Sequence, residues 1–96
     1  MSQPIELRVE VDGIPVLIDR CTFNDFRFLG YCASLEDGNA TDLYRLATML
    51  FGKEQLENVI SSIESDHGQA TVQNVGEFVR AVIEEAAKAL GGDVKN

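Results

Sequence analysis

The stretch VEVDGIPVLI, residues 9–18, constrains the fold more than any other part of the chain. Apolar and charged residues alternate over residues 5–11, a period of two that is typical of a strand with one buried face. Asp12-Gly13 follows, and this pair favours a type I′ turn because both turn positions need a positive φ. A second apolar run then begins at Ile14. The pattern predicts an antiparallel β-hairpin.

The hairpin needs a second layer, because an isolated two-stranded hairpin is only marginally stable in water. Its apolar face rests either on helices of the same chain or on another copy of the chain, and the sequence leaves both possibilities open. Pro15 lacks an N–H group and suits the edge of a sheet, whereas nothing comparable blocks the edge of the first strand. We therefore expect a sheet or oligomer contact from the apolar residues of that strand. These are Ile5, Leu7, Val9 and Val11.

Helical patterns fill the rest of the chain. The residues TFND, 22–25, resemble a capping box in which the Thr22 hydroxyl accepts from amides of the first turn. Helices are then expected from the capping box to a turn at Glu36–Asn39, from Asn39 or Thr41 to Gly52, over residues 53–65 and over about residues 72–90. The sequence thus predicts an α+β fold with about four helices in a single domain, residues 1–96. Its parts are a hairpin segment at residues 1–20, a helical body at residues 21–92 and a polar tail at residues 93–96.

Charge and hydropathy narrow the range of partners. The chain has 16 acidic and 8 basic residues, a formal net charge of −8, and its basic residues are scattered singly. Nucleic-acid binding depends on clustered Lys and Arg, so we expect no nucleic-acid partner. No apolar run is long enough to cross a bilayer, and the first residues lack the pattern of a secretory signal. We expect a cytoplasmic protein without membrane contact.

The sequence offers few residues for chemistry. His67, the only histidine, lies in a polar turn, whereas a general base must be held in a fixed geometry. Cys21 and Cys32 are spaced too widely for the usual zinc pairs, and we expect them to be buried, unreactive thiols. The sequence contains neither a phosphate-binding loop nor a calcium loop. We therefore predict that the protein is not an enzyme and that it has no catalytic residues, no cofactor and no metal.

Aromatic residues cluster near the start of the helical body, and the cluster has two interpretations. A chain without tryptophan must build its core from Phe and Leu, which favours core packing. The alternative is a face that binds another protein, to which the apolar stripe of the last helix would also contribute. The candidate partner-binding residues are Phe23, Phe26, Phe28, Tyr31, Phe78 and Val82.

Four stretches carry a resemblance to a known family. They are SLEDGNATDLYRLATMLFG, KEQLENVISSIES, VGEFVRAVIEEAAKAL and the end GGDVKN. Together they resemble the short tail assembly chaperones of long-tailed phages and of prophages, in which a small, acidic, mostly helical domain follows a short N-terminal β segment. The resemblance covers most of residues 22–96 and lies in the overall pattern, not in one motif.

The resemblance implies a non-enzymatic function in the cytoplasm of the host cell. Proteins of this family bind the long, aggregation-prone tape measure protein, help tail-tube subunits assemble around it and are absent from the mature virion. The partners implied are the tape measure protein, the tail-tube protein and further copies of the chain in a homo-oligomer. A longer frameshifted product is another family trait, and Val94-Lys95-Asn96 is compatible with a slippery run of codons. Two alternatives remain: an acidic helical adaptor or regulatory protein that acts through protein–protein contacts, and an enzyme subunit or small-ligand binder.

Overall fold

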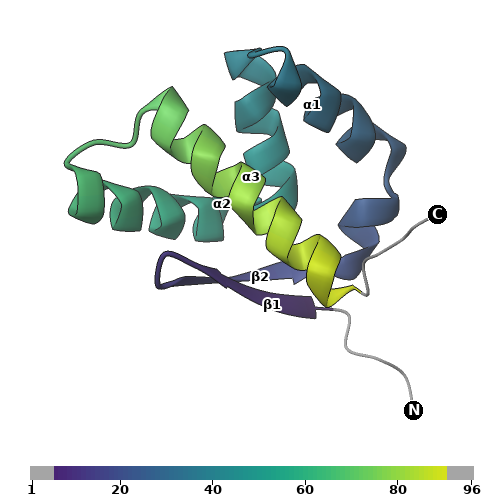
Figure 1. Ribbon diagram of the computed structural model, residues 1–96, viewed down its shortest axis with the longest axis horizontal. Helices are drawn as coiled ribbons and strands as arrows, with labels where there is room; N and C mark the ends of the chain where they lie inside the picture. The colour runs from purple at the N-terminus through teal and green to yellow at the C-terminus, as the bar shows by residue number, and fades with distance from the viewer. Residues whose placement is uncertain (1–5, 91–96) are drawn as a thin grey trace.

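A computed structural model describes residues 6–90, and Ile5 and the polar tail at residues 93–96 lie outside the described part. Two strands come first and helices follow, which is the expected α+β order. The elements are β1 (Glu6–Val11), β2 (Ile14–Asp19), the 3₁₀ helix η1 (Arg20–Asn24), α1 (Phe26–Glu36), α2 (Ala40–His67) and α3 (Val72–Ala89), shown in Figure 1.

The N-terminal hairpin is confirmed. Strand β1 pairs antiparallel with β2, and Val11 lies opposite Ile14 on the two sides of the turn. The turn residues Asp12 and Gly13 have φ angles of 54° and 79°. Two positive φ angles in a two-residue loop are the mark of a type I′ turn, whose twist matches that of the flanking strands.

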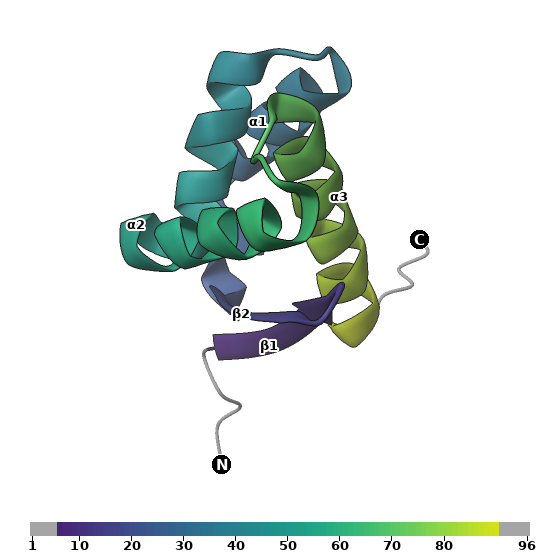
Figure 2. The same ribbon diagram turned by 90° about the vertical axis from the view of Figure 1, so that its left-hand side faces the viewer.

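One face of the hairpin packs on helices of the same chain. Helix α3 contacts β1 and helix α2 contacts β2. Figures 1 and 2 show both helices on the same side of the hairpin. The buried residues on this face are Val9, Ile14, Val16 and Ile18, and the half-buried ones are Leu7 and Val11. The hairpin therefore obtains its second layer inside one subunit.

The first α-helix begins later than the TFND pattern indicated, because η1 comes between the hairpin and α1. The Asp25 carboxylate, not the Thr22 hydroxyl, caps α1 by accepting a hydrogen bond from the Arg27 N–H at 2.9 Å. Asp19 caps η1 in the same way. The expected capping box at Thr22 is wrong because an aspartate on each side of it supplies a charged acceptor, which binds an amide more strongly than a hydroxyl does.

Residues 6–90 contain three α-helices, where the sequence predicted about four. The two helices expected on either side of Gly52 form one element, α2, whose two limbs run in different directions (Figures 1 and 2). Gly52 has a φ of 78° and a ψ of 163° and is the non-helical residue inside α2. The count differs by one because only a single non-helical glycine, and no connecting loop, separates the two expected helices, so they form the two limbs of one element. We name the limbs α2a, residues 40–51, and α2b, residues 53–67.

A single core joins the hairpin to the helices. Its most fully buried side chains come from β2, both limbs of α2 and α3. They are Val16, Ile18, Leu46, Val59, Val79 and Val82. No polar or charged residue of the described part is buried, so this core rests on apolar burial. Within residues 6–90, no helix combines the length and the hydropathy needed to cross a membrane.

Candidate protein-binding face

Helix α1 presents apolar side chains to solvent. Phe26, Leu29, Gly30 and Ala33 are spaced by three and four residues and therefore lie on one side of the helix. All four are exposed, and the relative exposures of Phe26 and Leu29 are 85% and 60%. We name these four residues the α1 stripe.

The opposite side of α1 packs on the core, so the stripe is a second apolar side of the same helix. Phe28 is buried on the core side, and Cys32 and Leu35 are half-buried against the core. The Phe28 ring meets the ring of Phe23 from η1 edge to face, with the centroids 4.9 Å apart and the planes at 72°. This contact and the Asp25 cap fix the start of α1, where Phe26 is the first residue.

A hollow of about 370 Å³ lies between α1 and α2a. Its lining combines aromatic, apolar and cationic side chains, namely Arg27 and Tyr31 from α1 and Tyr44, Arg45, Thr48 and Met49 from α2a. Each arginine has an aspartate beside it: Asp25 lies 3.7 Å from Arg27, and Asp42 lies 3.3 Å from Arg45. Both pairs are solvent-exposed and contribute little to stability. We name this site the tyrosine hollow.

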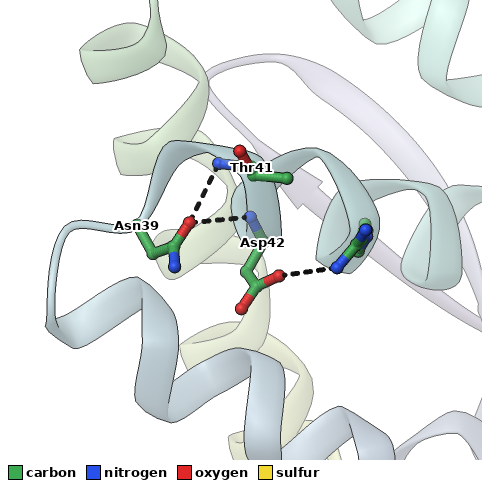
Figure 3. A network of polar contacts seen from close by, with 4 residues as sticks. Asn39, Thr41 and Asp42 are labelled. Carbon is green, nitrogen blue, oxygen red and sulfur yellow. Dashed lines mark hydrogen bonds and ion pairs between the residues drawn. The ribbon is translucent and has the colours of Figure 1, made fainter.

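Asn39 caps the N-terminus of α2a (Figure 3). Later residues of the same limb form one wall of the tyrosine hollow. The Oδ1 of Asn39 accepts hydrogen bonds from the backbone N–H groups of Thr41 at 3.1 Å and Asp42 at 3.3 Å. These are amides that the first turn of a helix leaves without a partner. Of the two caps that the sequence allowed, Asn39 is the one used. The Asp42 carboxylate pairs with Arg45 on the next turn.

The six candidate partner-binding residues fall into three groups. Three are buried in the core, so the folded chain does not offer them to a partner: Phe28, Phe78 and Val82. Phe23 and Tyr31 are half-buried, and Tyr31 lines the tyrosine hollow. Phe26 is largely exposed and begins the α1 stripe.

Sequence reasoning missed Leu29 and Tyr44, which are exposed. Leu29 lies three residues after Phe26, so helical spacing was a sufficient signal for placing both on one side of α1. Tyr44 follows the core residue Leu43 and points away from the core. Its place in the tyrosine hollow depends on the position of α1, for which the sequence gives no signal.

His67, Cys21 and Cys32 are the side chains that the sequence singled out for chemistry. No three His, Cys, Asp or Glu side chains of residues 6–90 converge as ligands of a metal ion. His67 is exposed at the last residue of α2. Cys21 is exposed and Cys32 is half-buried, so the expectation of two buried thiols is wrong. Burial, together with the negative charge of Glu36, raises the pKa of the Cys32 thiol, and Cys32 therefore stays protonated at neutral pH.

The α1 stripe and the tyrosine hollow are thus two exposed features of residues 6–90 with a composition suited to a protein partner. Comparison of this chain with protein-family models, with curated proteins and with solved structures gives no match.

Proposed function

We propose that this protein is a tail assembly chaperone of a long-tailed phage or prophage, a non-enzymatic protein that binds the tape measure protein and assists assembly of the tail tube. The resemblance, which covers most of residues 22–96, implies the client, and the α1 stripe is the observation that supports binding. Phe26 and Leu29 expose large apolar side chains on one side of a helix. Such a surface suits a client helix that has an apolar side of its own.

The client contributes an apolar helical surface that matches the α1 stripe. An amphipathic helix lays its apolar side along the α1 stripe, and each Å² of apolar surface removed from water contributes about 25 cal/mol. A stripe of four residues gives a contact well below the roughly 1,000 Å² of a stable interface. Each contact is therefore weak and reversible, and several copies hold a long client through avidity. Weak single contacts also allow the chaperone to leave as tail-tube subunits take its place.

The charge of the chain supports the same function. A formal net charge of −8 makes copies bound along one client repel other such complexes. Proteins with a net charge far from zero stay soluble, so a coated client stays in solution while its apolar segments are covered.

The test is co-expression of the chain with the tape measure protein, with the soluble fraction of that client as the measurement. The wild-type chain raises the soluble fraction, and the double variant Phe26→Ser/Leu29→Ser does not. The control is Val72→Ser, which removes a 61% exposed side chain that lies outside the α1 stripe. This variant raises the soluble fraction of the client as much as wild type does. A double variant that solubilises the client as well as wild type does would contradict the proposal.

A second candidate is an acidic helical adaptor with a client unrelated to phage tails. It is favoured by the composition of the α1 stripe, because four uncharged residues recognise apolar helical surface without specifying one protein. The positions of the genes separate the two candidates. A tail assembly chaperone is encoded between the genes for the major tail protein and a very long helical protein, and an adaptor has no such neighbours.

A further inference from the structure

The two edges of the hairpin expose different residues. In a hairpin with a two-residue turn, the two residues that flank the turn form both backbone hydrogen bonds with each other. Along the strands, such hydrogen-bonded pairs alternate with pairs whose backbone N–H and C=O groups point away from the partner strand. Val11 and Ile14 flank the turn, so the backbone N–H and C=O groups of every second residue, counted from this pair, point to the outer edge of each strand. The outward residues are Glu6, Arg8 and Glu10 in β1 and Pro15, Leu17 and Asp19 in β2.

The edge of β2 is closed. Pro15 has no N–H group to offer another strand. The side-chain amide of Gln55, from α2b, forms hydrogen bonds with both the backbone N–H and the backbone C=O of Leu17. Its Oε1 accepts from the Leu17 N–H and its Nε2 donates to the Leu17 carbonyl oxygen, each at 2.8 Å. Gln55 thus occupies the place that a neighbouring strand would take.

The edge of β1 is open within the described part of the chain. No hydrogen bond from another element of residues 6–90 reaches the outward backbone groups of Glu6, Arg8 or Glu10, and all three residues are exposed. Two of the three inward apolar residues of β1 are also less covered than those of β2. Leu7 and Val11 are half-buried, whereas the inward residues of β2 are buried. An open edge flanked by half-buried apolar residues is a template for another strand.

We propose that β1 pairs antiparallel with β1 of a second copy of this chain, in a register centred on Val9. This register sets Arg8 opposite Glu10 of the partner subunit, and two-fold symmetry forms the same pair a second time. It also sets Leu7 opposite the partner's Val11, so the half-buried residues of both copies cover each other. Opposite charges directly across two strands stabilise their pairing.

The charges and the length of β1 together favour this register and a second copy as the occupant. Moving the centre to Arg8 sets Arg8 against Arg8 of the partner subunit and Glu6 against the partner's Glu10, which brings like charges together at every outward pair. A register centred on Leu7 also pairs opposite charges, Glu6 with Arg8, but it overlaps only three residues of each β1, whereas the Val9-centred register overlaps five. The product is a four-stranded sheet with β2 at each end, and the Gln55 contact closes both ends, so the assembly stops at a dimer.

The test is sedimentation of the purified chain over a range of micromolar concentrations. Wild type forms a dimer that dissociates on dilution. Arg8→Glu alone and Glu10→Arg alone each place like charges at both pairs and weaken the dimer by at least about tenfold. An equal mixture of the two variants restores dimers, because each copy then meets the opposite charge.

Both substituted residues are exposed on the outer face of the hairpin, and circular dichroism verifies that the variants are folded. The control is Lys53→Glu, the same change of charge at an exposed residue of α2b, which leaves the dimer intact. A monomeric wild type at every concentration, single variants that dimerise as wild type does, or a mixture that stays monomeric would each overturn the proposal. The pairing involves no client, so its failure leaves the proposed function untouched.

Discussion

Gly52 has a φ of 78° and a ψ of 163°, a combination that essentially only glycine adopts. A Cβ added at this position meets no other atom within 4 Å, so space does not require a glycine there. The requirement is conformational. Gly68, which ends α2, has a φ of 84° and a ψ of −18°, the left-handed conformation of an ordinary helix-ending glycine. The sequence predicted that a helix ends at Gly52. The ψ angle of Gly52 depends on where α2b packs, and tertiary contacts determine that position.

We expect Gly52→Ala to lower the free energy of unfolding by about 1–3 kcal/mol, because alanine is strained in this backbone region. Urea denaturation followed by circular dichroism measures the change. The control is Gly30→Ala inside α1, where a Cβ also meets no atom within 4 Å and the backbone is helical. Alanine is favoured over glycine there by about 0.5–1 kcal/mol, so the control is as stable as wild type or more so. A Gly52→Ala variant as stable as wild type would show that the limbs join differently.

At the scale of elements, local signals were sufficient for the hairpin and insufficient for the helical body. Alternation and Asp12-Gly13 determine the hairpin without help from the rest of the chain. The start of α1 was missed because Asp19, Thr22 and Asp25 all belong to residue types that cap helices, and the choice depends on packing. The candidate site could be predicted from the sequence only in part, for the same reason. Helical spacing places Phe26 and Leu29 together, but only the position of α2 decides which side of α1 faces solvent.

The contact between α2b and β2 has one specific polar component, the Gln55 amide on Leu17. We expect Gln55→Ala to destabilise the fold by about 1–3 kcal/mol, because two hydrogen bonds to Leu17 are lost and each contributes about 0.5–1.5 kcal/mol. It also opens the edge of β2 and promotes association beyond a dimer. Denaturation and sedimentation measure the two effects. Gln73→Ala is the control, since the Gln73 amide makes one exposed contact of 3.4 Å with Glu77 and its loss changes stability by less than about 0.5 kcal/mol. Equal effects of the two substitutions would contradict a specific role for Gln55.

At the scale of the whole molecule, the hairpin and the helices share one core and are expected to unfold together. Val9, Val16 and Ile18 belong to the same buried cluster as Val79 and Val82 of α3. A chain of 96 residues has a total stability of roughly 5–15 kcal/mol, so the loss of one layer of this core is enough to unfold the rest.

Val9→Asp tests this cooperativity, because it places a carboxylate without a partner between β1 and α3. The expected cost is at least about 3 kcal/mol, and the helical circular dichroism signal reports it although the substitution lies in a strand. The control is Leu17→Asp on the outer face of β2, where the side chain is 45% exposed, and the expected change is below about 1 kcal/mol. If the helices of the Val9→Asp variant melt as in wild type, the hairpin is an appendage of an independent helical body. A lower melting temperature for the helical signal, with little change in the control, means that the strand is part of the core on which α3 depends.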